Sequence, residues 1–389
     1  MKHKLFGRLA LMATAVCLSL LLASPANAAS GTPTFVTGTG SDVAWRVMSA
    51  LDNLYNLSPG CNLLATPPAT QPLDESCQPD FPGAPTPTTE NVNHDIVREY
   101  APIGGSAGVS QLCAQGTAGV AAADFARQTK APSSSTCTGT SFVAYARDAL
   151  AYETWPGVAG SGTAAGFHNT SGTCAGSKVN VICLTQAQLQ GIFVTCTITN
   201  WNQVGGANVK IEPYVPLPAF GTRSAWDTFL GGDTSHCVTD PTHITPAETD
   251  NSYPKLDGNL KGAIMAVSYG SWNARYKKVS DGSKLGLVDK VTPSSTTISS
   301  GTYPFGRFIY NAYCTACASG HQANAATVSY VGEQGWICKA SAHTTIPFTT
   351  TNYRTAIVNA IKGAGFIPLP LGVIGGGNTS SDYCRLTTH

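Results

Sequence analysis

The sequence predicts an α/β fold of two lobes, built from mixed, mostly parallel sheets flanked by helices. Stretches with the apolar pattern of strands alternate with stretches of helical periodicity, which is typical of parallel βα units. The chain has 389 residues, a length that fits about two domains with separate cores. Only 12% of the residues are charged, whereas Gly (40) and Pro (24) are abundant. This composition excludes a coiled coil or a charged disordered chain.

Residues 1–28 are predicted to be a signal peptide. A basic start precedes the uncharged apolar run 9–23, and Ala26-Asn27-Ala28 has the small-x-small pattern that a signal peptidase accepts. The run is short for a membrane span, and no later segment approaches the ~20 apolar residues that a spanning helix needs. Cleavage after Ala28 would give a secreted, extracellular protein of the cell envelope.

The charge of the chain excludes one class of function. The formal net charge is +1, and the signal peptide contains only basic charges, Lys2, Lys4 and Arg8, so the mature chain is close to neutral. Binding of nucleic acid through bulk charge requires a strongly basic protein. We therefore expect no nucleic-acid partner.

The cysteines agree with export. There are 13, and an even number remains without Cys17 of the signal peptide, as expected for a disulfide framework. Cys314-Thr-Ala-Cys317 is the spacing of a redox motif or of half a zinc site, but no second such motif and no histidine pair accompany it, so we expect no metal and no cofactor. The connectivity is left open, although mostly local bridges are expected. The cysteines nearest in sequence are Cys61 and Cys77, Cys113 and Cys137, Cys174 and Cys183, and Cys314 and Cys317.

The first βα unit is the clearest local signal. Residues 34–40 are predicted to form a strand that runs into a glycine turn. Ser41 or Asp42 then caps a helix over 43–55, in which apolar residues recur at helical spacing. The Pro-rich stretch 58–89 that follows predicts a surface loop.

The later elements continue the same alternation. Predicted strands or extended runs cover 99–103, 120–126, 141–152, 209–217, 263–269 and 304–313. Predicted helices begin at 109, cover 184–193 with Thr185 at the start, and cover 225–230 and 350–363.

Three glycine turns stand between a predicted strand and a predicted helix, at 38–42, 104–108 and 221–224. The first N–H groups of a helix are unpaired and carry a positive partial charge, and glycine lets the backbone come close to a ligand. Such turns bind anions without lysine. Arg127 and Arg223 lie near two of them. The pattern predicts one anion site shared by several helix starts.

Several motifs occur in a characteristic order along most of 34–389. They are 36–42 (VTGTGSD), 103–109 (IGGSAGV), 124–130 (DFARQTK), 142–148 (FVAYARD), 184–201, 220–223 (FGTR) and 303–313 (YPFGRFIYNAY). In these motifs the chain resembles the phosphate-binding proteins of ABC importers, in an actinobacterial-style branch of this type II family.

The resemblance implies a two-lobed periplasmic-binding-protein fold. It implies that 29–147 and 304–389 form lobe 1 and that 148–303 form lobe 2. The implied function is capture of phosphate or a related tetrahedral oxyanion in the cleft between the lobes, and delivery to ABC permease subunits. The implied protein is a monomer and not an enzyme.

Carried over by position, the resemblance implies nine ligand-binding residues: Ser41, Asp42, Gly105, Ser106, Arg127, Thr129, Gly221, Thr222 and Arg223. The sequence also departs from the family. Thr129 stands where the family often has a carboxylate that accepts the proton of hydrogen phosphate. Gly105 and Phe220 stand where serines are common. Asp42, in the first turn, could supply the missing acceptor.

Two alternative functions remain open from the residues alone. Residues 104–108 also fit the G-x-S-x-G elbow of a secreted serine hydrolase, with Ser106 as the nucleophile. Such an enzyme needs a downstream acid and histidine. The histidines available to such an enzyme, none of them in a diagnostic setting, are His168, His236, His243, His321 and His343.

The second alternative is an extracellular binding protein without a role in transport.

Overall fold

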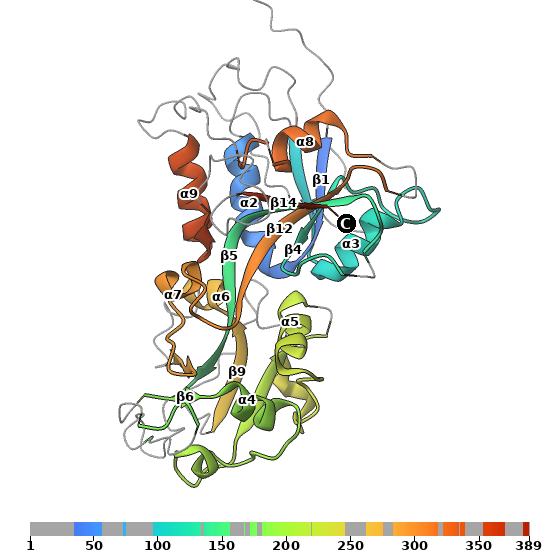
Figure 1. Cartoon of the computed structure of the whole chain (residues 1–389). Coiled ribbons are helices and arrows are strands. Elements are labelled where there is room, and N and C mark those ends of the chain that lie inside the picture. The colour runs from blue at the N-terminus through green and yellow to red at the C-terminus, as the bar shows by residue number, and fades with distance from the viewer. Residues whose placement is uncertain are drawn as a thin grey trace, which may run out of the picture.

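A computed structural model describes residues 35–56, 73–74, 96–133, 136–155, 167, 172–176, 181–218, 220–245, 262–274, 283–317, 322–333, 335–338, 353–369 and 384–388. The predicted signal peptide, the pair Cys61 and Cys77, and nearly all of the loop 58–89 lie outside these residues. The fold class is confirmed: mixed sheets are flanked by helices in two lobes (Figure 1). Within the described ranges, no helix is both long and apolar enough to cross a membrane.

Lobe 1 is built on parallel strands. Strand β1 (Phe35–Gly40) lies between β3 (Ile96–Tyr100) and β4 (Phe125–Gln128) and pairs with both in parallel. The short β2 (Leu73–Asp74) pairs with β3 in antiparallel orientation. The helices of this lobe are α2 (Asp42–Asn56), α3 (Gly105–Cys113), α8 (Ala325–Val331) and α9 (Tyr353–Gly363) (Figure 1).

Lobe 2 repeats this arrangement on a smaller scale. Strand β7 (Glu212–Pro216) pairs in parallel with β9 (Ala263–Ser268) and with β8 (Ile244–Thr245). Strands β6 (Cys183–Leu184) and β11 (Leu287–Val288) form a separate parallel pair. The helices are α4 (Gln186–Phe193), α5 (Gly221–Leu230), α6 (Tyr269–Ala274) and α7 (Ser295–Ser299), with 3-10 turns η2 (Trp201–Val204) and η3 (Pro241–His243).

The long strand β5 (Thr140–Thr154) connects the lobes. Its first part pairs in antiparallel orientation with β12 (Gly306–Cys314), and its last part pairs with β9. Ala146 belongs to the core of lobe 1 and Ala149 to the core of lobe 2. The predicted lobe boundaries at 147/148 and 303/304 stay predictions. Short strands β10 (Lys284–Leu285), β13 (Ile367–Pro368) and β14 (Arg385–Thr388) also pair with β5.

Two helices begin earlier than predicted. The glycine turns at 104–108 and 221–224 are themselves helical, because α3 begins at Gly105 and α5 at Gly221. The helix expected from Thr185 is confirmed: Thr185 accepts a hydrogen bond from the backbone N–H of Gln188, whose side chain accepts one in return. This is a capping box, which satisfies two of the free groups at a helix start.

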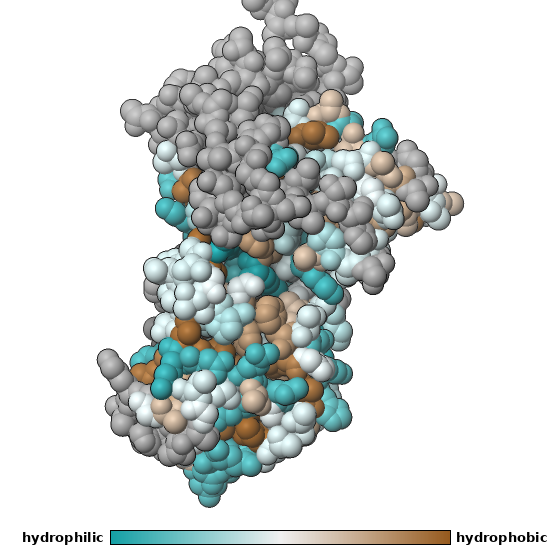
Figure 2. All heavy atoms as spheres, viewed as in Figure 1, coloured by the Kyte–Doolittle hydropathy of each residue, from teal (hydrophilic) through white to brown (hydrophobic). Residues whose placement is uncertain are grey.

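Five disulfides link described residues. Three of them join the pairs nearest in sequence, as expected for local bridges. The other two close longer loops, Cys196–Cys237 and Cys338–Cys384. Figure 2 shows hydrophilic and hydrophobic residues mixed over this face of lobe 2. Among the described residues, Val328 is the large apolar side chain that is clearly exposed.

Candidate functional site between the lobes

The first glycine turn ends in a buried carboxylate. Asp42 is the first residue of α2, and its carboxylate is fully buried with no hydrogen-bond partner for either oxygen. Burial raises the pKa of Asp42 to about 6. The backbone N–H groups of Asp42 and Val43, which do not form hydrogen bonds of normal geometry with the carboxylate, and the charges of Arg307 and Arg127 lower this pKa. A buried acceptor without a partner is costly, so it marks a place where a ligand could bind.

Arg127, at the end of β4, holds the ends of the neighbouring strands. Its Nε donates to the carbonyl of Ser41 at 3.2 Å, and its Nη2 donates to the carbonyl of Tyr100 at 3.1 Å. The same guanidinium forms a fully buried ion pair with Glu99. Arg127 therefore fixes the backbone that leads into Asp42, and most of its donors already have acceptors.

The second glycine turn lies against the end of β4. A side chain at Gly105 would overlap Oε1 of Gln128, and that oxygen accepts a hydrogen bond from the backbone N–H of Thr129 at 2.8 Å. Oγ1 of Thr129 is buried and has no partner. Ser106, in the first turn of α3, is exposed. The N-terminus of α3 has no side-chain cap, because Gly104 precedes it with φ of 91°.

The third glycine turn comes from lobe 2 and meets the same strand end. A Cβ at Gly221 would overlap Oγ1 of Thr129, so the absence of a side chain lets α5 approach lobe 1. The N-terminus of α5 also lacks a side-chain cap. Lys130 Nζ donates to Oγ of Ser224 at 3.5 Å, and α2 contacts α5. The three turns therefore gather around residues 127–130.

Arg223 is buried but directed toward other groups of lobe 2. Its Nε donates to Oδ1 of Asp227 at 2.9 Å, its Nη1 donates to the carbonyl of Pro216, and its Nη2 pairs with Asp233. Arginine four residues before an aspartate on one helix is a recognisable pairing pattern. A direct role of Arg223 in binding stays a prediction, and these contacts give it a role in fixing the start of α5.

Arg307 is a residue that the sequence analysis missed. It lies on β12, and its Nη2 donates to Oγ1 of Thr222 at 3.0 Å. Its Nε donates to Oδ2 of Asp148 at 2.9 Å. Its Nη1 is buried and has no partner. The charge of Arg307 lowers the pKa of Asp42. The sequence did contain a signal for this residue, because Arg307 is a charged side chain inside the otherwise mostly apolar run 303–313.

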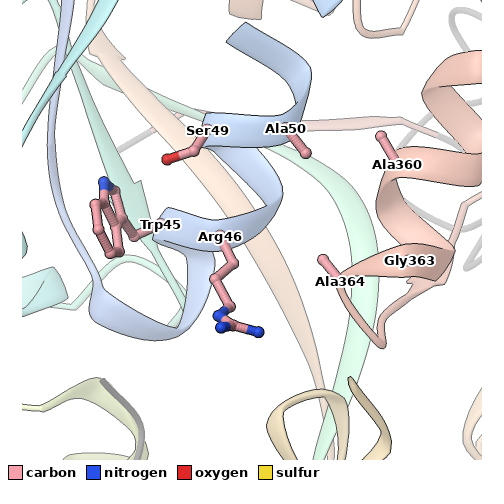
Figure 3. Close-up of a pocket in the computed structure, with 7 residues that line it drawn as sticks. All are labelled: Trp45, Arg46, Ser49, Ala50, Ala360, Gly363 and Ala364. Carbon is pink, nitrogen blue, oxygen red and sulfur yellow. The ribbon is translucent and has the colours of Figure 1, made fainter. Parts of the chain in front are cut away.

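Two further features, a hollow and a cluster of sulfur atoms, are not formed by the predicted site residues. A hollow of about 500 Å³ lies between α2 and α9, where Arg46 and Ala50 face Ala360 and Ala364 (Figure 3), and none of the nine predicted residues lines it. Sulfur atoms of Cys137, Cys314 and Cys317 gather within 4.8 Å, but each belongs to a disulfide.

The histidines required by the hydrolase alternative are only partly described. His236 and His243 are the two described ones, and His243 stacks on Tyr214 beside Asp240 in lobe 2. Neither of these two histidines contacts Ser106, so neither stands as its general base in the structure.

A family model of the PBP superfamily domain matches residues 97–328, more than half of the chain. The chain therefore belongs to the PBP superfamily, a superfamily of binding proteins rather than enzymes. This confirms the superfamily to which the sequence resemblance pointed.

Three solved structures are similar to the chain at low sequence identity. An ABC-type phosphate transport receptor from Vibrio cholerae is 22% identical, with 73% of this chain and 88% of that chain covered and a TM-score of 0.46. A putative phosphate ABC transporter substrate-binding protein with bound phosphate from Clostridium perfringens is 16% identical, with 86% and 100% covered and a TM-score of 0.48. A possible phosphate binding protein from Planctomyces limnophilus is 14% identical, with 87% and 94% covered and a TM-score of 0.46. No curated protein matches the chain.

Proposed function

We propose that the protein is an exported solute-binding protein that captures phosphate, or a related tetrahedral oxyanion that carries a proton, between its lobes. The observation that carries the proposal is two buried, unpartnered groups: the carboxylate of Asp42 at the start of α2, and Nη1 of Arg307 on β12, whose charge lowers the pKa of Asp42. One is an acceptor and the other a donor. A protonated oxyanion offers the matching acceptor and donor in one ligand.

The proposed donors come from both lobes. Oγ1 of Thr129 and Nη1 of Arg307 are buried and unpartnered. Thr222, in the first turn of α5, is fully buried beside Arg307. The starts of α2, α3 and α5 add N–H groups and the positive ends of their dipoles. Ser41, Gly105, Ser106 and Gly221 contribute in this proposal through these helix starts.

The charges near this site favour an anion that keeps its proton. Arg127 faces Glu99 and Arg307 faces Asp148, so both guanidinium groups already have a carboxylate partner. The charge of the ligand would therefore be stabilised by hydrogen bonds and helix dipoles rather than by excess cations. Ionised Asp42 repels an anion that lacks a proton and accepts a hydrogen bond from one that has it. This gives Asp42 the function of the carboxylate that Thr129 replaces.

The transport role rests on the superfamily and on the sequence resemblance. In this proposal the mature chain starts after Ala28, acts outside the membrane as a monomer and hands the anion to ABC permease subunits. Closure of the lobes around the anion would be a hinge motion about β5 and β12, and binding would select the closed form.

The test is isothermal titration calorimetry of the purified protein with phosphate and with sulfate. We expect one phosphate per chain, and we expect Arg307→Gln to weaken binding by about 10- to 100-fold, the value of a charge-assisted hydrogen bond in a buried site. Thr129→Val, which removes a hydroxyl without changing the shape, should weaken phosphate binding by about tenfold.

The matched control is Arg98→Gln, which removes an arginine outside the proposed site. Arg98 lies on β3, where its Nε donates to Thr37 and its guanidinium lies over the ring of Phe35. Unchanged phosphate affinity in both site variants would remove the proposed site.

A further inference from the structure

Two disulfides of the protein are in direct contact. Cys113–Cys137 joins the last residue of α3 to the segment before β5, and Cys314–Cys317 lies at the end of β12. Sγ of Cys137 lies 3.7 Å from Sγ of Cys317, which is van der Waals contact between sulfur atoms of different disulfides. Among the disulfides that the structure describes, this is the pair with such a contact. Thiol–disulfide exchange requires this type of approach, a sulfur against a neighbouring disulfide.

The contact is held by the register of the sheet. Thr140, the first residue of β5, pairs with Cys314 of β12. The carbonyl of Gly139 accepts hydrogen bonds from the backbone N–H groups of Thr315 and Ala316, at 2.8 and 3.1 Å. The Cys314–Cys317 loop is thereby fixed on the segment that carries Cys137. The two disulfides do not depend on loop motion to meet.

Exposure differs between the two disulfides. Cys113 and Cys137 are half-buried, whereas Cys314 and Cys317 are buried. The hydroxyl of Thr140 donates to the carbonyl of Cys137 at 2.8 Å, and its Oγ1 lies 3.1 Å from Sγ of Cys137 and 3.6 Å from Sγ of Cys317. The first residue of β5 is thereby fixed against both sulfurs. A reductant in solution reaches Cys113–Cys137 first, and the buried bond is reached through it.

We propose that these four cysteines form a thiol–disulfide exchange site whose substrate is a dithiol, such as the dithiol of an extracytoplasmic oxidoreductase. A thiolate of the dithiol attacks Sγ of Cys113, which breaks Cys113–Cys137 and releases the Cys137 thiolate. The Cys137 thiolate attacks Sγ of Cys317, which forms Cys137–Cys317 and breaks Cys314–Cys317. The Cys314 thiolate leaves and takes up a proton. The second thiolate of the dithiol then attacks the mixed disulfide, and Cys113 leaves as a thiol.

The step balances as a two-electron transfer. The dithiol becomes a disulfide, and the protein exchanges two disulfides for one disulfide and two thiols, Cys113 and Cys314. The cross-link of Cys137, in the segment before β5, moves from Cys113 of α3 to Cys317, which follows β12. Helix α3, which begins at the second glycine turn, loses its covalent link to the segment before β5. The site is independent of the proposed anion binding.

The first experiment frees one sulfur by substitution. In Cys113→Ser the Cys137 thiol is unpaired, and we expect it to displace Cys314, so that peptide mapping after alkylation finds Cys137–Cys317 and a labelled Cys314. The matched control is Cys237→Ser, which frees the half-buried Cys196 far from these sulfurs in the fold, and there Cys196 itself should carry the label. A labelled Cys137 with Cys314–Cys317 intact would overturn the proposal.

The second experiment uses the unaltered protein, which does not depend on the variant folding. Native protein is treated briefly with dithiothreitol, quenched with acid, alkylated and mapped. We expect Cys113 and Cys314 to be labelled together and Cys137–Cys317 to be present. Joint labelling of Cys113 and Cys137 would show simple reduction and contradict exchange. Absence of label at Cys113, under conditions that open Cys196–Cys237, would also contradict it.

Discussion

Arg307 on β12 donates a hydrogen bond from Nη2 to Oγ1 of Thr222 at 3.0 Å and so joins the strands that cross between the lobes to the first turn of α5. The same guanidinium pairs with Asp148 of β5, with 2.7 Å between Nη2 and Oδ2. Asp148 also accepts hydrogen bonds from Oγ of Ser268 and from the backbone N–H of Gly270, at 2.9 and 2.8 Å. One buried carboxylate therefore organises β5, β9, α6 and β12 where the lobes meet.

We expect Asp148→Asn to destabilise the protein strongly. The substitution leaves the Arg307 guanidinium buried without its opposite charge, and breaking a buried ion pair on one side costs about 3–5 kcal/mol. Urea denaturation followed by tryptophan fluorescence measures the free energy of unfolding. The control is the double variant Asp148→Asn with Arg307→Gln, which should lose less than the sum of the two single variants. Additive losses would mean that the two side chains do not act as a pair.

The ionisation of Asp42 should appear in the pH dependence of stability. Its pKa is about 6 in the folded protein, against an ordinary value of 3.8 for an aspartate in water, so the folded protein holds the proton more tightly than the unfolded chain. The protonated carboxyl group therefore adds to the free energy of unfolding below pH 4, and this contribution is lost as the pH rises to about 6. The difference between the two pKa values corresponds to a total loss of about 3 kcal/mol.

The measurement is urea denaturation at several pH values, without phosphate or sulfate, for the wild-type protein and for Asp42→Asn. Asn has the same shape and does not titrate, so the difference between the two proteins isolates the carboxylate. We expect Asp42→Asn to gain in relative stability between pH 4 and pH 6 and to stay level above pH 6. A constant difference across this range would contradict a raised pKa.

The same carboxylate should make the selectivity of the site depend on pH. Sulfate has no proton to donate at neutral pH, so it binds only when Asp42 is protonated. Its affinity should fall about tenfold per pH unit above pH 6, because one proton is taken up on binding. Phosphate brings its own proton, so its affinity should fall less.

Calorimetry with both anions between pH 6 and pH 8 tests this selectivity. In Asp42→Asn, the sulfate affinity should no longer change with pH, because the titrating group is gone. Equal pH slopes for sulfate in the variant and in the wild-type protein would assign the pH dependence to another group.

Much of the fold could be predicted from local patterns. The strand 34–40, the helix that follows it and the helix after Thr185 all have their expected positions, because periodicity and capping act within a few residues. The starts of α3 and α5 were placed too late. Glycine is a poor helix former, so the glycines at 104–108 and at 221 suggested turns rather than the first residues of helices. The close approach of Gln128 to Gly105, and of Thr129 to Gly221, is a tertiary reason for glycine there.

Local sequence patterns indicate the helix starts of the candidate site and, through the resemblance, Arg127 and Arg223, but they do not indicate Arg307 or the partners of Arg127. Asp42 and the three turns lie at strand ends, where sequence order alone indicates a shared edge. Arg307 becomes a site residue only through the pairing of β12 with β5, which sets it opposite Asp148. The partners of Arg127 are likewise distant in sequence: Glu99 and the carbonyl of Tyr100 come from β3. Such long-range pairings leave no local pattern.

The contact between Gly221 and Thr129 should control closure of the lobes. A Cβ at Gly221 overlaps Oγ1 of Thr129, so Gly221→Ala should hold α5 away from lobe 1 and weaken phosphate binding by about tenfold or more. Small-angle X-ray scattering with phosphate present should give a larger radius of gyration for this variant. Adding Thr129→Ala removes the overlapping hydroxyl and should restore the smaller radius, but not the affinity, because the donor is lost as well. If Gly221→Ala stayed as compact as the wild-type protein, or if the double variant stayed expanded, the contact would not be the element that limits closure.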